Sequence, residues 1–147
     1  MYSNRSSTDS VRTPPYILNY VKKHWGNFYD PVPYQPNFNP KIHPDGLVIP
    51  WKDVNYINPP FSRAKKFVMR GWQLYVHAHK KSIFLVKANI VASQYFGKLS
   101  QDAELRFFSH HITFPGYSKP APFALMLVIF DGKNPGKYSV IPREVCK

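Results

Sequence analysis

Two apolar runs of strand length constrain the fold more than any other feature of this sequence. Residues 82–86 (SIFLV) and 123–130 (FALMLVIF) carry almost only apolar side chains, as strands that are buried on both faces of a sheet do. Segments with the apolar period of a helix lie before and between these runs. Alternating strands and helices predict an α/β layer fold, whose ligand sites lie at the carboxyl ends of the strands.

The other expected elements follow the same alternation. A first helix is expected from Thr13, because Pro14 and Pro15 suit a first turn, and Gly26 suits its end. A second helix is expected from Ser62, where apolar residues recur on one face. Further strands are expected over residues 28–30, 54–57 and 105–108, and a further helix over 90–100. Residues 31–50 are expected to form an irregular loop, since their prolines remove backbone donors.

The length of 147 residues suits one domain. Residues 1–12 are polar and predict a flexible arm ahead of a single domain, residues 13–147. The arm has no apolar stretch typical of a secretory signal, and the run 123–130 is too short to cross a bilayer. We therefore expect an intracellular protein with no membrane partner, in the cytoplasm or nucleus of a host cell if it is viral. Cys146 is the single cysteine, which excludes an internal disulfide and a thiolate metal cluster.

The charge indicates the partner. Twenty Lys and Arg against eight Asp and Glu give a net charge of +12, and so dense a positive field attracts polyanions. Nucleic acid is the expected partner. A basic ribosomal or capsid component has the same composition, so the charge leaves the chemistry open.

The tetrapeptide Asn58-Pro59-Pro60-Phe61 follows a short expected strand and precedes an amphipathic helix. An exocyclic amino group such as that of adenine is a poor nucleophile, because its lone pair is delocalised into the ring. The Asn58 side-chain oxygen and the Pro59 carbonyl can each accept a hydrogen bond from one N–H of this amino group, while the prolines fix the directions of the two acceptors. Phe61 offers a face on which a flipped base can stack. A simple turn after a strand is the alternative interpretation.

An ordered set of motifs accompanies the tetrapeptide and resembles the phage-type DNA N6-adenine methyltransferase family. The set comprises Thr13-Pro14-Pro15-Tyr16, Asp30-Pro31, Asp45-Gly46-Leu47, Pro50-Trp51, residues 84–88 (FLVKA), Tyr95-Phe96, residues 105–107 (LRF) and residues 121–123 (APF). The sequence departs from the family in two places. Residues 30–34 replace a Gly-rich loop, and His110-His111 replace a Gly-Arg pair.

The resemblance implies methylation of adenine N6 in double-stranded DNA with S-adenosylmethionine as the cofactor and no metal. It implies a compact Rossmann-like class I methyltransferase fold, with a mostly parallel sheet flanked by helices. The catalytic residues would be Asn58, Pro59, Pro60 and Phe61. The residues implied for the cofactor are Thr13, Pro14, Pro15, Tyr16, Asp30, Pro31 and Asp45. Without the resemblance, Asp30 and Asp45 suit ordinary turn positions.

Basic residues near the tetrapeptide are the candidates for nucleic-acid contacts. Arg63 is expected to bind a phosphate, because it comes two residues after Phe61. Further candidates for nucleic-acid contacts are Lys65, Lys66 and Lys119, although a single lysine is also typical of a solvent-exposed helix face. The pairs His77/His79 and His110/His111 lack the spacing of a zinc site, so no metal is expected.

Alternative functions stay open from the sequence. One is a catalytically degenerate methyltransferase-fold protein that serves as a nucleic-acid-binding or virion structural component. Another is an RNA adenine methyltransferase. A third is an enzyme that methylates a planar amide such as a glutamine side chain, although the positive charge disfavours a protein substrate. A homodimer is also open, because a small domain often needs a second subunit to grip duplex DNA.

Overall fold

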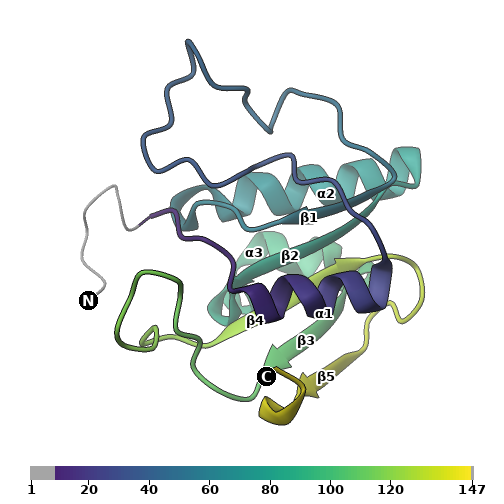
Figure 1. The fold of residues 1–147 in the computed structure, drawn as a ribbon. Coiled ribbons are helices and arrows are strands. Elements are labelled where there is room, and N and C mark those ends of the chain that lie inside the picture. The colour runs from purple at the N-terminus through teal and green to yellow at the C-terminus, as the bar shows by residue number, and fades with distance from the viewer. Residues whose placement is uncertain (1–8, 147) are drawn as a thin grey trace.

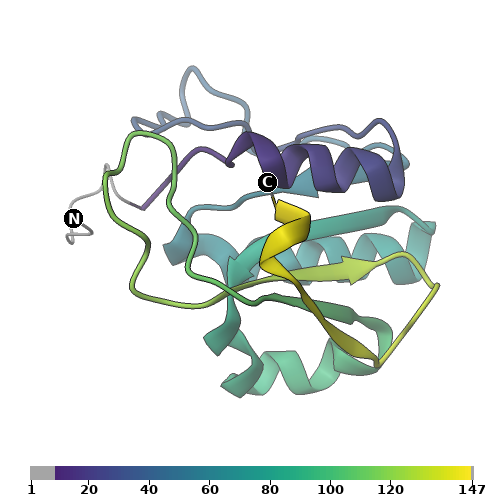
Figure 2. The same cartoon turned by 60° about the horizontal axis from the view of Figure 1, so that its bottom comes forward.

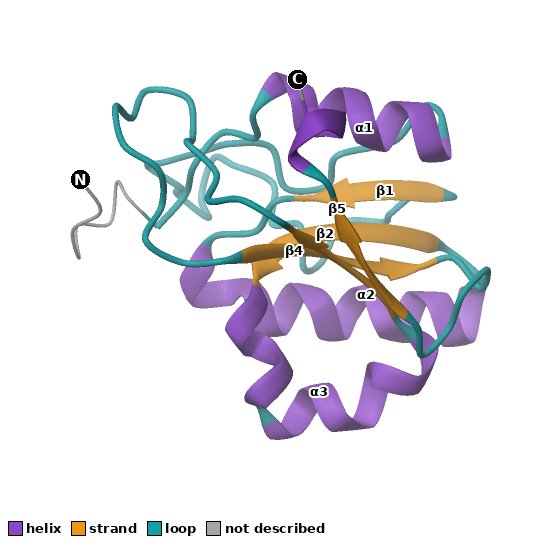
Figure 3. Ribbon diagram, turned by 90° about the horizontal axis from the view of Figure 1, so that it is seen from below, coloured by secondary structure: helices purple, strands orange, loops and turns teal. Residues whose placement is uncertain are grey.

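The alternating pattern folds into three layers, which a computed structural model describes for residues 9–146. Helix α1 (Pro15–Trp25) covers one face of a central sheet, and α2 (Ala64–Ala78) and α3 (Gln94–Leu99) cover the other (Figure 3). Short 3-10 turns join or follow these elements: η2 (Phe61–Arg63), η3 (Ala88–Ala92), η4 (Ser100–Asp102) and η5 (Arg143–Cys146). None of the helices among these residues is long and apolar enough to span a membrane.

The sheet has five strands in the order β1-β2-β4-β3-β5. Strands β1 and β2 are parallel, β3 and β5 are parallel, and β4 is antiparallel to both of its neighbours. The α/β class with flanking helices is thus confirmed, whereas the sheet is mixed and not the mostly parallel one expected. The strands are β1 (Val54–Ile57), β2 (Lys81–Lys87), β3 (Glu104–Phe108), β4 (Leu125–Phe130) and β5 (Tyr138–Ile141).

The reversal of β4 follows from the segment that precedes it. Residues 109–124 contain no helix and fold back on themselves, with the Ala121 N–H donating to the Ile112 carbonyl at 2.8 Å. Figure 2 shows this segment as a loop that stays at one end of the sheet. Because a parallel return needs a crossover to the other end, β4 instead enters where β3 leaves.

The core lies on both faces of the sheet. In β2, Ile83 and Leu85 pack in the cluster beneath α1, whereas Phe84 and Val86 pack in the cluster beneath α2. The same alternation divides β4, so residues 82–86 and 125–130 are buried on two faces, as the sequence predicted, whereas Phe123 and Ala124 precede the strand. Gly71 lets α2 approach closely, because a Cβ there would lie 2.4 Å from the Phe84 ring.

Several local boundaries differ from expectation. Helix α1 has Pro14 and not Thr13 at its N-cap, the strand at 28–30 is a single bridge between Tyr29 and Asn55, and the helix at 90–100 is divided between η3 and α3. Strand β5 was not expected; it is short, and three of its four residues, including the apolar Tyr138 and Val140, are exposed.

The proposed arm is partly fixed in place. Residues 1–8 lie outside the described residues, whereas Val11 is buried in the core beneath α1 and Asp9 contacts Ser62. The packed part of the chain therefore begins before residue 13.

Candidate active site

A cavity of about 760 Å³ opens at the carboxyl end of β1. Strands β1 and β2 and the bridge at Tyr29 all run in the same direction, so their carboxyl ends meet at one edge (Figure 1). This is the edge where an α/β sheet binds its ligands. The walls come from residues 9–11, residues 29–36 with Phe38, a second stretch of the loop (His43, Pro44, Gly46, Ile49, Pro50), and Asn58, Pro60, Arg63 and Phe67.

The Pro-rich loop 31–50 forms the outer wall of the cavity, and backbone anchors hold it. The Trp51 indole N–H donates to the Gly46 carbonyl at 2.8 Å, and an Arg70 guanidinium N–H donates to the Ile49 carbonyl at 2.8 Å. Gly46 lies against the start of the loop, since a Cβ there would meet the Pro31 oxygen at 2.7 Å. The loop is thus closed on itself, although it has neither helix nor strand.

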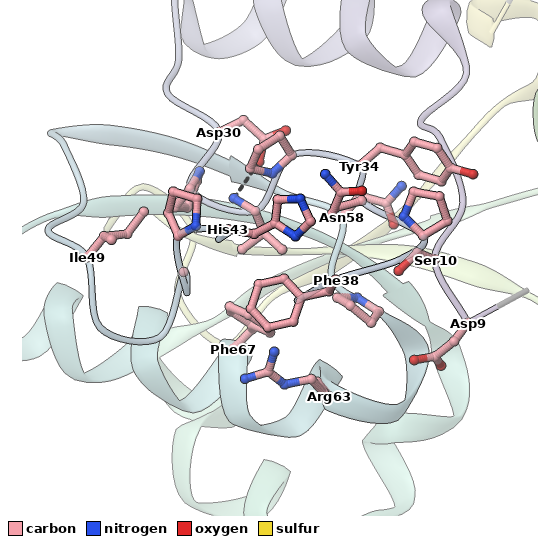
Figure 4. Close-up of a pocket in the computed structure, with 18 of the residues that line it drawn as sticks. Asp9, Ser10, Asp30, Tyr34, Phe38, His43, Ile49, Asn58, Arg63 and Phe67 are labelled. Atoms are coloured by element: carbon pink, nitrogen blue, oxygen red, sulfur yellow. Dashed lines mark hydrogen bonds between the residues drawn. The ribbon is translucent and has the colours of Figure 1, made fainter. Parts of the chain in front are cut away.

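The side chain of Asn58 is held in one orientation. Its Nδ2 donates to the Val11 carbonyl at 2.8 Å and to Thr13 Oγ1 at 3.0 Å. The Thr13 hydroxyl is in turn hydrogen-bonded to the Tyr56 hydroxyl at 2.9 Å. With both donors of the amide engaged by the protein, the side-chain oxygen is left as an acceptor. Among residues 9–146 nothing donates to this oxygen, and Asn58 lines the cavity (Figure 4).

Asp9 fixes the turn that follows the tetrapeptide. Its backbone carbonyl accepts the Phe61 N–H at 2.9 Å, and its carboxylate accepts the Ser62 N–H at 2.8 Å and the Ser62 hydroxyl at 2.6 Å. A carboxylate on the first free N–H groups of a helical segment acts as a cap. Residues 9–13 thus form a strap across the tetrapeptide, which positions both Asn58 and Phe61.

Two acidic residues, Asp9 and Asp30, line the cavity, and the Asp9 carboxylate is engaged by Ser62. Burial raises the pKa of the Asp30 carboxyl to about 6, although the hydrogen bond from the Val32 N–H at 2.8 Å opposes this shift. Burial without a cation partner costs the charged form free energy. A positively charged ligand group in this cavity would therefore find a strong partner.

Arg63 faces the cavity and lies beside Asp45. Its guanidinium lies 3.5 Å from the Asp45 carboxylate, over the rings of Phe38 at 5.7 Å and Phe67 at 5.2 Å. Figure 4 shows Arg63 below these two rings. Asp45 itself follows Pro44 and precedes Gly46, which both line the cavity. The structure therefore groups Arg63 with the residues expected to hold the cofactor.

Phe61 is not part of the cavity wall and packs in an aromatic cluster next to it. Its ring meets Phe114 at 6.3 Å and Phe123 at 5.4 Å between centroids. The ammonium of Lys87 lies 4.6 Å from the Phe61 centroid and 4.3 Å from that of Phe123. The tetrapeptide thus contributes to two neighbouring environments, a cavity lined by Asn58 and Pro60 and an aromatic cluster around Phe61.

The structure brings together only part of the predicted set. Of the cofactor candidates, Asp30 and Pro31 line the cavity and Asp45 is adjacent to it, whereas Thr13, Pro14, Pro15 and Tyr16 are not part of its wall. Pro59 is buried and is not part of the wall. Of the nucleic-acid candidates, Lys66 and Lys119 are exposed, and the Lys65 ammonium lies over the Tyr95 ring at 5.4 Å.

Sequence reasoning missed several residues of the site. Asp9 was assigned to the arm, and Phe38, Phe67, Lys87 and Phe123 were not singled out. The motifs at residues 84–88 and 121–123 contain Lys87 and Phe123 and were a signal for these two, whereas the other residues are defined only by contacts across the fold. Within residues 9–146 no group of three His, Cys, Asp or Glu side chains is arranged to hold a metal ion.

No protein-family model matches this sequence, and no curated protein matches it. The geometry of the site therefore carries the functional argument.

Proposed function

We propose that this protein is an S-adenosylmethionine-dependent methyltransferase that modifies the N6 amino group of adenine in DNA. The observation that carries the proposal is the orientation of Asn58. Its Nδ2 is bound by Val11 and Thr13, so its oxygen is the free acceptor at the cavity wall. An acceptor in a fixed position is what an incoming amino group requires.

The cavity has the size and chemistry that the cofactor needs. Its volume of about 760 Å³ falls within the range of small-molecule sites. Apolar walls that include Val32, Ile49 and Phe67 suit a nucleoside base, and the Asp30 carboxylate suits a ribose hydroxyl or an ammonium group. The Arg63 guanidinium suits a carboxylate. These residues would hold S-adenosylmethionine, which supplies a methyl group on a sulfonium when bound.

The residues of the chain then position the acceptor amine. Asn58 Oδ1 accepts one N–H of the adenine amino group, and the Pro59 carbonyl is proposed to accept the other, which draws the lone pair out of the ring. Orientation of this kind contributes up to roughly 7 to 11 kcal/mol in favourable cases. Phe61 holds the base by stacking, worth about 1 to 3 kcal/mol. The proton released from the nitrogen passes to water.

The sheet is compatible with the proposed Rossmann-like methyltransferase fold. The bridge at Tyr29, β1 and β2 form a consecutive parallel set, and their carboxyl ends carry Asp30, Asn58 and Lys87. The reversed strand β4 lies on the far side of β2 and leaves this edge intact. The net charge of +12 favours a nucleic-acid substrate over a protein one.

The test combines cofactor binding with methyl transfer. Calorimetric titration with S-adenosylmethionine should give saturable binding, and transfer of a tritiated methyl group should label duplex DNA that contains adenine. A duplex of only G·C pairs with the same length and charge is the matched control and should stay unlabelled. Labelling of RNA or of a glutamine-containing protein instead would reassign the substrate. DNA binding with neither cofactor binding nor transfer would establish a degenerate binding protein.

A further inference from the structure

The edge of the sheet opposite the candidate active site carries a face of lysines. This amino edge lies where α1 ends and where β1 and β2 begin (Figure 3). The loop from β4 to β5 reaches the same edge, because β4 is antiparallel to β2 and Phe130 at its end pairs with Ser82. Six exposed lysines lie there, and we call them the lysine face: Lys22, Lys23, Lys52, Lys81, Lys133 and Lys137.

Three carboxylates of the amino edge are bound by tryptophan and arginine side chains. Asp131 is 8% exposed, and its carboxylate accepts the Trp25 indole N–H at 2.9 Å and the Lys133 backbone N–H at 3.0 Å. Asp102 accepts a second indole N–H, and Glu104 pairs with a guanidinium. Among residues 9–146 no lysine forms an ion pair. These acids therefore hold the fold and do not neutralise the lysine face.

A buried amide fixes the backbone at two of the lysines. Asn55 in β1 is fully buried, and its Nδ2 donates to the Lys52 carbonyl at 2.8 Å and to the Lys81 carbonyl at 3.0 Å. Its Oδ1 accepts the Lys52 N–H at 2.9 Å. Asp53 is an exposed acid of this face, but the positive charges are in excess. Like charges in one region of the surface repel, and a bound polyanion relieves this repulsion.

The lysine face is long enough for several phosphates. Lys52 precedes β1 and Lys137 precedes β5, which are the outer strands of the five-stranded sheet. Strands about 4.8 Å apart place these two ends about 19 Å from one another, which is the length of about six phosphates along one strand of DNA. An ammonium is a compact point charge that contacts phosphate without reading a base. An extended row of such charges therefore favours a continuous polyanion over a small anion.

We infer that the lysine face binds the phosphate backbone of a second nucleic-acid segment, separate from the segment whose adenine the carboxyl edge receives. Strand β2 has seven residues, which at about 3.3 Å each place the two edges about 20 Å apart. The edges face in opposite directions, so a straight duplex across the carboxyl edge leaves the lysine face free. The inference goes beyond the proposed function, because it makes one copy of the protein a bridge between two segments.

The test is the capture of one duplex by another, with no cofactor. A biotinylated duplex of G·C pairs is immobilised and saturated with protein, and a labelled duplex of the same sequence is titrated onto it over a salt series. The parent should capture the labelled duplex saturably, and less as salt rises. The variant Lys22→Gln/Lys81→Gln/Lys133→Gln should lower the affinity for the labelled duplex by about tenfold or more, and the slope of log affinity against log salt by about three.

The matched control is Lys41→Gln/Lys98→Gln/Arg143→Gln. It removes the same charge from exposed residues outside the lysine face, so it should keep the parental capture and slope. Methyl transfer separates the two edges. At a saturating concentration of an adenine-containing duplex, the lysine-face variant should transfer methyl groups at the parental rate, because its substitutions lie away from the carboxyl edge.

Different outcomes overturn the inference in different ways. No capture by the parent, or an equal loss in both variants, would make the lysine face an ordinary solvated surface. Undiminished capture by the lysine-face variant would mean that two copies bridge the duplexes through their carboxyl edges. Stronger binding of a polyglutamate peptide than of a duplex with equal charge would assign the face to an acidic protein. Capture that depends on the lysine face without any methyl transfer would retain the inference and refute the proposed function, so the two failures are distinguishable.

Discussion

Three acidic side chains at one edge of the sheet have stronger partners than Asp30 has at the other edge. At the amino edge of β3, Glu104 pairs with Arg106 at 2.8 Å. Nearby, the Asp131 and Asp102 carboxylates each accept an indole N–H at 2.9 Å, from Trp25 and Trp72. At the carboxyl edge of β1, Asp30 accepts the N–H of Val32 two residues away, and burial raises its pKa to about 6.

The carboxylates of Glu104, Asp131 and Asp102 stabilise the fold, whereas that of Asp30 is available to a ligand. A buried carboxylate that accepts strong hydrogen bonds contributes to stability, and removing it leaves its partners unpaired. A buried carboxylate without a cation destabilises the folded state when it ionises, and a positively charged ligand relieves this cost. The contrast predicts which substitutions affect stability and which affect binding.

The largest effect is expected at the amino edge. Glu104→Ala leaves the partly buried Arg106 guanidinium without its carboxylate, so the free energy of unfolding should fall by about 3 kcal/mol, with cofactor affinity of the remaining folded protein unchanged. Urea unfolding and calorimetric titration measure the two quantities. The exposed Glu144→Ala should alter stability by less than about 0.5 kcal/mol. A loss below about 1 kcal/mol for Glu104→Ala would remove the distinction between the edges.

The next effect concerns turnover at the carboxyl edge. Asn58→Ala removes the fixed acceptor, so single-turnover methyl transfer should slow by about a hundredfold or more, with the cofactor Kd little changed. Thr13→Val removes one anchor of the Asn58 amide but keeps its oxygen, and should slow transfer less. The exposed Asn19→Ala is the control and should keep the parental rate. Transfer by Asn58→Ala at that rate would refute the catalytic assignment.

Asp30→Asn should separate binding from stability. Burial raises the pKa of Asp30 from the ordinary aspartate value of 3.8 to about 6 in the folded protein, so the folded state holds the proton more tightly than an unfolded chain would. Stability of the parent should therefore fall as pH rises from about 4 to 6, by an amount on the order of 1 to 3 kcal/mol. The Asn variant should lack this decrease and be more stable than the parent at pH 8.

Cofactor affinity should show the opposite response. The parent should bind S-adenosylmethionine more weakly as pH falls through 6, because a protonated Asp30 cannot pair with a cation, whereas Asp30→Asn should bind weakly and without this pH dependence. Calorimetry at several pH values measures both. The exposed Asp53→Asn should behave as the parent does. Full affinity of Asp30→Asn would place the cofactor elsewhere.

The smallest effect concerns DNA binding. Lys119 is exposed on the 109–124 loop, whereas Arg63 faces the cavity beside Asp45. Lys119→Gln should lower the slope of log affinity against log salt by about one, and Arg63→Gln should leave this slope unchanged while it weakens cofactor binding. Filter binding over a salt series measures the slope. Equal decreases of the slope for both variants would show that Arg63 contacts a phosphate, as the sequence predicted.

Features that depend on local pattern could be predicted from the sequence. Continuous apolar runs fixed β2 and β4 as strands buried on both faces, and the helical period after Ser62 fixed α2. These two signals placed Asn58 between a strand end and a helix start. Such features are predictable because the period of side chains along a strand or helix is set by the backbone itself.

Contacts between segments far apart in the sequence set the direction of β4, the cavity and the orientation of Asn58, so none of these could be predicted. Asn58 is held by Val11 and Thr13, more than forty positions earlier, and Lys87 lies between rings from separate segments. Loops 31–50 and 109–124 have no periodic pattern, so their paths depend on what they pack against. The sequence thus selected the residues of the tetrapeptide, while contacts between distant segments decided which of their atoms face a ligand.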